Sequence, residues 1–264
     1  MSMKFPPLAP AAERPALVTG ASSGIGRATA QALAALGHPV VVGARRAERL
    51  DELVGVIREA GGEATACAVD VTDADSVRDF VVAAGEAYGP PDVLVSSAGS
   101  LTMARVWEMD PADFAAQTDV HLLSVQRLLH AVMPGMVERR RGDVVLIGSD
   151  VSYTARPRSG AYVAAKAGLE TMAHQIRKEL EGTGVRLGVV RPGPVMTEMG
   201  SEFDPATAEA VINDWVKHGL GRHPRMCKPA DLARGVVTMV STVRGAQITE
   251  LEIQPEAPIE EDYS

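Results

Sequence analysis

Close to its N-terminus the chain reads Ala16-Leu17-Val18-Thr19-Gly20-Ala21-Ser22-Ser23-Gly24-Ile25-Gly26. The first four residues form the apolar run of a buried strand, and a helical pattern begins near Gly24. Glycines between a strand and a helix permit positive φ angles and leave space beside the backbone, because they lack a Cβ atom. The amide groups at the start of the helix then point at a bound phosphate, and serine hydroxyls add donors. A P-loop is excluded because no Lys-Ser or Lys-Thr pair follows the glycines.

Strand and helix patterns alternate along the rest of the chain. Further short apolar runs predict strands at 39–43, 64–69, 92–95, 143–147, 185–190 and 249–253. Helical patterns lie between them, and Thr72 with Asp75 resembles a capping box that opens one of the helices. This order predicts an α/β fold, a single Rossmann domain whose doubly wound parallel sheet of about seven strands carries helices on both faces. We expect this domain at 15–256, a flexible leader at 1–14 and an acidic tail at 257–264.

Composition narrows the class of protein. The 264 residues carry a formal net charge of −8, which argues against non-specific binding to nucleic acid or anionic membranes. Cys67 and Cys227 form neither a zinc-type spacing nor a disulfide framework, which fits a reducing, cytoplasmic location. No apolar run approaches the roughly 18 residues of a membrane span, and the histidines show no metal-binding spacing. We therefore expect no metal, no nucleic acid and no membrane partner.

Two arginines follow the second predicted strand, where the sequence reads Val42-Gly43-Ala44-Arg45-Arg46. Rossmann domains that prefer NAD place an acidic residue near the end of this strand, on the ribose hydroxyls. No acid is present here, and a guanidinium group suits a 2′-phosphate. The pattern predicts NADP(H) as the cofactor, with solvated arginines at a helix start as the alternative.

Tyr162 and Lys166 lie at the start of a predicted helix, four residues apart and therefore on one face. A nearby ammonium group favours the phenolate and lowers the pKa of a tyrosine, which prepares the phenol to exchange a proton with a substrate oxygen. Ser149 follows the strand predicted at 143–147. Ligands of doubly wound sheets bind at this edge, so the Ser149 hydroxyl is a candidate donor to the same oxygen.

The spacing Thr-Gly-x-x-x-Gly-x-Gly at 19–26 resembles the turn of the short-chain dehydrogenase/reductase family, and the resemblance extends over 16–253. It implies that Ser149, Tyr162 and Lys166 form the catalytic site, with Lys166 also on the cofactor ribose. It favours Arg45 over Arg46 as the contact to the 2′-phosphate. The positions that it assigns to the cofactor are Gly20, Ser22, Ser23, Gly24, Ile25, Gly26, Arg45, Arg46, Asp70, Val71, Ala98, Gly99, Tyr162, Lys166, Pro192, Gly193, Val195 and Thr197.

For several of these positions the resemblance also implies which part of the cofactor they contact. Asp70 and Val71 match the pair that holds the edge of the adenine ring. The backbone near Val195 and the hydroxyl of Thr197 match the segment that holds the nicotinamide carboxamide.

The sequence departs from the family pattern beside two of the predicted site segments. Ser96 and Ser97 stand where the family usually has two asparagines before Ala-Gly, so a backbone role is favoured there over a side-chain role. His121 stands where the long helix usually carries an asparagine. Three interpretations of His121 stay open: it packs and keeps the backbone path to a water, it joins the proton relay as a catalytic residue, or it alters the chemistry.

Together these patterns predict an NADP-dependent oxidoreductase that interconverts a carbonyl and a secondary alcohol. A catalytically weak NADP-binding regulator or scaffold on the same fold is the main alternative, followed by an isomerase or epimerase. The segment from Met196 to Met226 is expected to form a movable wall over the nicotinamide and to favour an apolar or amphipathic substrate. The alternative is that its apolar residues only pack the segment onto the rest of the protein. These residues are Met196, Met199, Phe203, Val211, Ile212, Trp215 and Leu220.

The helix predicted at 112–139 carries apolar residues on more than one face, which together with the resemblance predicts a homo-dimer or homo-tetramer. These residues are Val120, Leu123, Leu128, Val132 and Met136.

Overall fold

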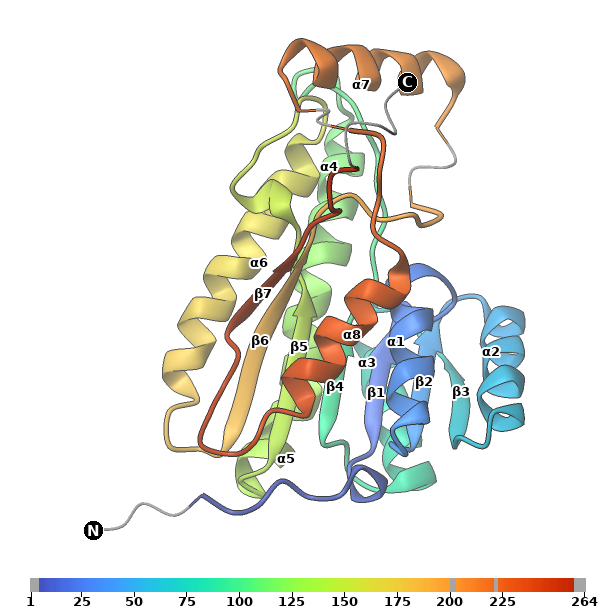
Figure 1. Cartoon of the computed structure of the whole chain (residues 1–264), viewed down its shortest axis with the longest axis vertical. Helices are drawn as coiled ribbons and strands as arrows, with labels where there is room; N and C mark the ends of the chain where they lie inside the picture. The colour runs from blue at the N-terminus through green and yellow to red at the C-terminus, as the bar shows by residue number, and fades with distance from the viewer. Residues whose placement is uncertain (1–4, 200–202, 221–222, 259–264) are drawn as a thin grey trace.

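The structure, a computed structural model, describes residues 5–199, 203–220 and 223–258 and contains a parallel sheet of seven strands (Figure 1). The strands are β1 (Ala16–Thr19), β2 (Val40–Ala44), β3 (Ala64–Ala68), β4 (Val93–Ser96), β5 (Gly142–Ile147), β6 (Val185–Pro192) and β7 (Glu250–Ile253). Their order across the sheet is β3-β2-β1-β4-β5-β6-β7. The predicted α/β fold with its single doubly wound domain is confirmed.

Helices cover both faces of the sheet, and successive strand residues point to opposite faces. On one face, Ala16 and Val18 of β1 pack with α1 (Gly24–Ala35), α2 (Ala47–Glu59) and α8 (Pro229–Val240). On the other, Leu17 packs with α3 (Ala74–Tyr88), α5 (Ser124–Glu138) and α6 (Gly160–Glu179). This two-sided burial explains why the strands read as continuous apolar runs.

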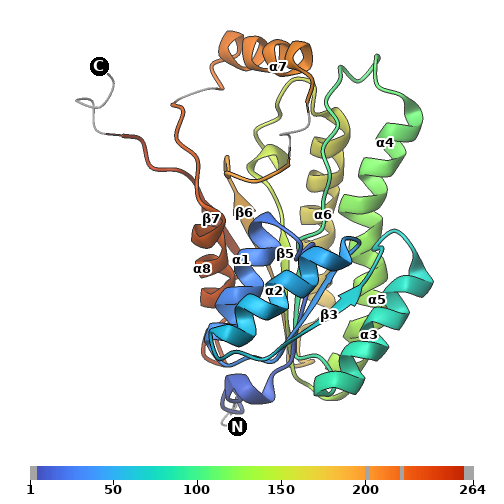
Figure 2. The same ribbon diagram turned by 90° about the vertical axis from the view of Figure 1, so that its right-hand side faces the viewer.

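The first 3-10 turn, η1 (Ala11–Glu13), precedes β1, and α7 (Pro205–Lys217) lies beyond the carboxyl ends of the strands (Figure 2). Asp204 caps α7, since its carboxylate accepts hydrogen bonds of 3.0 Å from the amides of Ala206 and Thr207. Parts of the predicted leader and acidic tail, residues 1–4 and 259–264, lie outside the described residues. No helix among the described ranges has the length and apolar character needed to cross a membrane.

The strand order reverses between β1 and β4, which are neighbours in the sheet although β2 and β3 separate them in the chain. Loops after strands on either side of such a reversal diverge and leave a crevice for a ligand. The glycine-rich turn leaves β1 at this point, and Ser97 follows β4, with its amide donating to the Thr19 hydroxyl at 3.3 Å. The topology therefore places the predicted phosphate-binding turn at the switch point of the sheet.

The predicted capping box at Thr72 and Asp75 is wrong. Asp73 caps α3 instead, because its carboxylate accepts from the amides of Asp75 at 2.8 Å and Ser76 at 3.1 Å. The Thr72 hydroxyl is occupied elsewhere, since it donates to the Asp70 carboxylate at 2.7 Å.

The predicted long helix consists of α4 (Pro111–Thr118), a π-helical turn η2 (Asp119–Leu123) and α5, joined without a break. The amide of Ser124 bonds the carbonyl of Asp119, five residues earlier, as a π-turn requires. Of the apolar residues that suggested subunit contacts, Leu128, Val132 and Met136 are buried in the core, whereas Leu123 is 47% exposed. The homo-oligomer thus stays a prediction, with less apolar surface behind it than the sequence suggested.

Candidate active site and dinucleotide site

The glycine-rich turn packs so closely that side chains are excluded from it. Gly20 and Gly24 have φ angles of +67° and +55°, which residues with a Cβ atom rarely adopt. A Cβ atom on Gly20 would lie 2.6 Å from the carbonyl carbon of Ser97 in the loop after β4, and one on Gly26 would meet the carbonyl of Gly20. The turn therefore presents backbone at the start of α1, the arrangement that binds phosphate.

The two predicted phosphate-contacting arginines have different surroundings. The Nη2 atom of Arg46 donates to the hydroxyls of Ser22 at 2.9 Å and Ser23 at 3.3 Å, so it lies directly beside the glycine-rich turn. Arg45 is exposed and has no hydrogen-bond partner among the described residues, but its charge lowers the pKa of Asp70 after the stronger effect of two hydrogen bonds from Thr72. Both arginines thus border the region between β1, β2 and the turn.

Ser149, Tyr162 and Lys166 converge beyond the carboxyl end of β5. Ser149 follows β5 and caps the short 3-10 turn η3 (Asp150–Ser152), while the other two residues lie in the first turns of α6. The Lys166 Nζ atom lies 5.7 Å from the centre of the Tyr162 ring. The three side chains therefore lie close together where β5 ends and α6 begins.

The protonation of this group differs from the sequence-based expectation in one respect. Burial raises the pKa of Tyr162 above its ordinary value and outweighs the hydrogen bond from Ser149. Lys166 donates instead to the carbonyl of Ile147 at 2.6 Å, and burial lowers its own pKa to about 8 against the opposing charge of Glu170. The lowered phenol pKa expected from the sequence is not found here, because the ammonium group is directed at the backbone of β5.

Comparison with known proteins decides the family. The sequence model of short chain dehydrogenases matches residues 14–208. The chain belongs to the short-chain dehydrogenase family.

Relatives of this short-chain dehydrogenase differ in length. Glycine betaine reductase ATRR of Emericella nidulans is 35% identical over 94% of the chain, which spans only 19% of that protein. The 3-oxoacyl-[acyl-carrier-protein] reductase FabG of Thermotoga maritima is 32% identical over 85% of the chain and 89% of its own length. A metagenomic short-chain oxidoreductase solved in complex with NADP is 29% identical and superimposes with a TM-score of 0.78 over 95% of this chain and 100% of its own.

His121 of this short-chain dehydrogenase lies on η2, buried between Tyr162 and the loop after β4. Its ring meets that of Tyr162 edge-on, with 4.9 Å between centroids. The Nε2 atom is 2.6 Å from the carbonyl oxygen of Ser100 and 3.3 Å from the amide nitrogen of the same residue. The shorter contact, to an acceptor, favours a proton on Nε2. Burial, helped by the charge of Lys166, lowers the pKa of His121 to about 3, so the ring is neutral at working pH.

The other ring nitrogen of His121 lacks a partner. Nδ1 is buried and makes no hydrogen bond with the described residues, although a neutral ring protonated at Nε2 has an acceptor there. Close packing holds the ring in place, since a Cβ atom on Gly99 would lie 2.7 Å from its Cε1 atom. The position therefore offers a fixed acceptor beside Tyr162, and the relay interpretation stays a prediction.

The segment after β6 lies across the predicted nicotinamide site of the dehydrogenase. Gly193 donates from its amide to the carbonyl of Ile253 at 2.9 Å, and Pro192 is buried. Val195 pairs with Cys227 in an isolated parallel bridge, which fixes the backbone that the resemblance assigns to the carboxamide. Thr197 packs over the glycine-rich turn, because its Cγ2 atom is 3.1 Å from the place of a Cβ atom on Gly24.

A charged pair beside Ser149 was not recognised as a pair from the sequence. Asp150 follows Ser149, is buried, and accepts from Arg156 at 2.5 Å. The Arg156 guanidinium lies 5.2 Å from the centre of the Trp215 ring in α7, and Arg158 donates to Asp214 of the same helix at 2.6 Å. These contacts fasten α7 of the predicted wall to the loop between β5 and α6.

The other predicted adenine-side residues are engaged locally. The Asp70 carboxylate accepts from the amide of Thr72 at 2.9 Å as well as from its hydroxyl, and Val71 is buried. Ile25 packs against the hydrophobic cluster on one face of the sheet, and Ala98 packs against the cluster on the other face.

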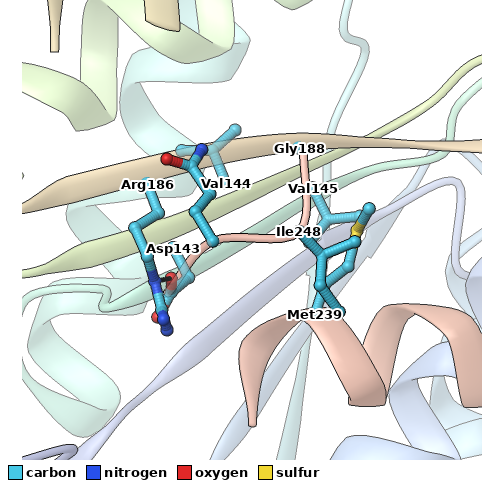
Figure 3. Close-up of a pocket in the computed structure, with 8 residues that line it drawn as sticks. Asp143, Val144, Val145, Arg186, Gly188, Met239 and Ile248 are labelled. Atoms are coloured by element: carbon cyan, nitrogen blue, oxygen red, sulfur yellow. Dashed lines mark hydrogen bonds and ion pairs between the residues drawn. The ribbon is translucent and has the colours of Figure 1, made fainter. Parts of the chain in front are cut away.

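A small cavity lies away from Ser149, Tyr162 and Lys166, at the amino end of the sheet (Figure 3). Its volume is about 10 Å³, and Asp143, Arg186 and Met239 are among the residues that line it. Such a volume holds about one water molecule at most, so this cavity is not a substrate site. Among the described residues, no group of three or more His, Cys, Asp or Glu side chains is arranged to hold a metal ion.

Proposed function

We propose that this chain is an NADP(H)-dependent oxidoreductase that interconverts a carbonyl and a secondary alcohol. The observation that carries the proposal is the convergence of Ser149, Tyr162 and Lys166 beyond β5, next to a glycine-rich turn at the switch point of the sheet. No observation favours a regulator without turnover, since the catalytic group is complete. A cytoplasmic location belongs to the proposal and rests on the two free cysteines.

The residues around the glycine-rich turn fit a dinucleotide with a third phosphate. Positive φ at Gly20 and Gly24 exposes backbone amides at the start of α1. Arg46 brings a guanidinium group to the same turn, 2.9 Å from Ser22, and Arg45 adds a second exposed cation. The metagenomic relative binds NADP on the same fold, which supports the choice of cofactor.

The nicotinamide supplies or accepts the hydride when bound, and the side chains manage the proton. Ser149 and Tyr162 donate to the carbonyl oxygen and favour the charge that develops on it. Tyr162 then transfers its proton to that oxygen, or accepts one in the direction of oxidation. Its raised pKa keeps the phenol protonated at neutral pH, which suits carbonyl reduction.

Lys166 contributes a positive charge next to Tyr162. Its ammonium is held by the carbonyl of Ile147 at 2.6 Å, so two donors remain for the cofactor ribose that the resemblance assigns to it. A pKa of about 8 keeps most of the group protonated at pH 7. The positive charge is therefore available to stabilise a phenolate once Tyr162 has given up its proton.

The substrate is proposed to be apolar or amphipathic. Val211 is buried on the inner side of α7, and Trp215 stacks with Arg156, whereas Met196 and Met199 are 62% and 41% exposed. Mobile methionine side chains suit a binding wall that adapts to different apolar groups. The Asp150–Arg156 pair provides polar contacts beside this surface.

Oxidation of NADPH in the presence of a panel of ketones and aldehydes tests the proposal through the loss of its absorbance. Tyr162→Phe removes the proton donor and is expected to lower turnover by about 10²- to 10⁴-fold, the usual contribution of general acid–base catalysis. Tyr153→Phe is the matched control, because its hydroxyl bonds Glu252 at 2.5 Å and its side chain is 58% exposed. Undiminished turnover in Tyr162→Phe contradicts the assignment of the acid.

A homo-dimer or homo-tetramer completes the proposal. Leu123 and Val137 are exposed apolar residues on η2 and α5. Light scattering of the purified chain tests it, and a mass of one chain, 27.8 kDa, contradicts it.

A further inference from the structure

Glu198 connects the segment after β6 to the predicted phosphate-binding arginines. Its carboxylate oxygens both lie 2.7 Å from the Nη1 atom of Arg49, and one of them lies 3.3 Å from Nη1 of Arg46. About 150 residues of sequence separate the partners, so the contact bridges two walls of the dinucleotide site. The two arginines hold the pKa of Glu198 below its ordinary value, with Arg49 contributing the most.

Arg46 is the N-cap of α2 and Arg49 lies in its first turn, and both guanidinium groups contact the Glu198 carboxylate. Arg46 also donates to Ser22 and Ser23 of the glycine-rich turn. A carboxylate and a phosphate present similar oxygens to a guanidinium group. Glu198 therefore occupies the same donors that a phosphate on the adenosine ribose would use.

Thr197, the residue before Glu198, covers the glycine-rich turn. Thr197 lies against Gly24, the first residue of α1, with its Cγ2 atom 3.1 Å from the place of a Cβ atom there. Two consecutive residues thus close over both the glycine-rich turn and the arginines. The chain beyond them leads to α7, so their position sets where the wall over the nicotinamide begins.

We propose that Glu198 is an internal substitute for the 2′-phosphate of NADP(H), and that Arg49 is a third arginine of the phosphate site. Binding of the 2′-phosphate displaces Glu198 from Arg46 and Arg49. NAD(H) carries no group that competes for these donors. The inference rests on the proposed use of NADP(H), and it adds a carboxylate that opposes the phosphate at its own site.

Calorimetric titration of the full chain with adenosine 2′-monophosphate tests the competition without any turnover. Removing the charge in Glu198→Gln is expected to tighten binding about three- to tenfold, a modest change because exposed ion pairs are individually weak. Adenosine, which lacks the phosphate, is expected to bind wild type and variant equally. Glu209→Gln is the matched control, since Glu209 is exposed on α7 and has no ion pair among the described residues.

Arg49→Gln separates competition from simple repulsion at a distance. If Arg49 binds the phosphate, this variant weakens the binding of adenosine 2′-monophosphate, and Glu198→Gln then has a smaller effect in the Arg49→Gln background than in wild type. Equal effects of Glu198→Gln in both backgrounds contradict a shared site. Weaker phosphate binding in Glu198→Gln alone overturns the proposal, because it means that Glu198 positions the arginines for the phosphate.

The same titrations with NADPH and NADH distinguish failure of this inference from failure of the proposed function. A wild-type preference for NADPH that is unchanged in Glu198→Gln refutes the substitute role and leaves the cofactor assignment intact. A wild-type preference for NADH refutes the cofactor assignment, and with it the basis of the inference.

Discussion

The two ends of the parallel sheet bury charge in different ways. At the amino end, Asp143 in β5 is buried and paired with both Arg14 and Arg186, the latter at 2.6 Å. At the carboxyl end, Lys166 has a single backbone carbonyl as its hydrogen-bond partner among the described residues, and His121 keeps one buried nitrogen without any. The ion pairs of Asp143 tie β5 to neighbouring segments, although the Nη2 atom of Arg186 has no hydrogen-bond partner among the described residues. At the carboxyl end, Lys166 and His121 keep donors and an acceptor that a ligand can use.

Two buried histidines, one at each end of the sheet, differ in whether Nδ1 has a hydrogen-bond partner. His38 at the amino end lies 2.8 Å from the carbonyl of Arg14 through Nδ1, and burial lowers its pKa. His121 at the carboxyl end also has a lowered pKa, but its Nδ1 is unpartnered among the described residues. Burial alone is therefore no sign of function, and it is the unpartnered Nδ1 atom that distinguishes His121 from His38.

The largest expected effect is a loss of stability when a buried charge at the amino end of the sheet is removed. Asp143→Asn leaves the buried guanidinium groups of Arg14 and Arg186 without their counter-charge, which is expected to lower the free energy of unfolding by about 3–5 kcal/mol. Urea denaturation followed by circular dichroism measures it. Asp75→Asn is the control, because Asp75 pairs with Arg78 on the surface, with side chains 78% and 62% exposed, and a loss of at most about 1 kcal/mol is expected.

The same variant tests whether the amino end of the sheet contributes to stability but not to cofactor binding. Asp143→Asn is expected to keep the NADPH affinity of the folded protein, since Asp143 is at the opposite end of β5 from Ser149. A large loss of cofactor affinity at a temperature where the variant is folded contradicts the division of roles.

The second prediction perturbs the carboxyl end without touching the fold. Arg45→Ala removes an exposed side chain and is expected to weaken NADPH binding about 10- to 100-fold, because a hydrogen bond to a charged group contributes about 1.5–3 kcal/mol. NADH binding is expected to change little. Fluorescence titration with each cofactor measures the difference, and the preference for NADPH should shrink as salt screens the contact.

Equal losses for both cofactors would place Arg45 outside the phosphate site. Arg46 would then be the main contact, in keeping with its hydrogen bonds to Ser22 and Ser23.

The smallest expected effect concerns the pH dependence of stability. The pKa of His121 is about 3 in the folded chain against about 6.5 when unfolded, so the unfolded state binds more protons as the pH falls below about 6.5. Stability is thereby lost on acidification, by on the order of 0.5 kcal/mol between pH 7 and pH 6. His121→Asn is expected to lack this part of the slope. Urea denaturation at several pH values compares the two proteins, and an unchanged slope argues against a neutral His121.

The fold was predictable because the central strands bury both of their faces and therefore read as apolar runs, whereas β7 at the edge alternates exposed and partly buried residues. Val185–Val190 and Ala16–Thr19 were recovered as strands from this signal alone. The helix start at Asp73 was missed, because Thr72 offers the same capping chemistry and only the structure shows its hydroxyl bonded to Asp70. Local competition between neighbouring polar side chains leaves no periodic signal.

The candidate site was predictable where it depends on strand ends and unpredictable where it depends on contacts across the sheet. Ser149, Tyr162 and Lys166 could be grouped because one strand end and one helix start converge in any doubly wound sheet. The pairing of Glu198 with Arg49 joins two exposed charges that no spacing relates. The direction in which Lys166 donates likewise depended on the carbonyl of Ile147, which the sequence does not place.

The π-helical turn η2 makes the long helix sensitive to the number of residues in it, and not only to their kind. A π-turn accommodates one residue more than an α-turn, and each residue of an α-helix advances the side-chain direction by about 100°. Because the π-turn takes up the extra residue, deleting one residue from Asp119–Leu123 would restore regular α geometry with little change in register between α4 and α5, whereas a deletion inside α4 or α5 would turn the side chains beyond it by about 100°. His121 lies in this turn, so a deletion there would also remove the widened backbone that holds its ring edge-on to Tyr162.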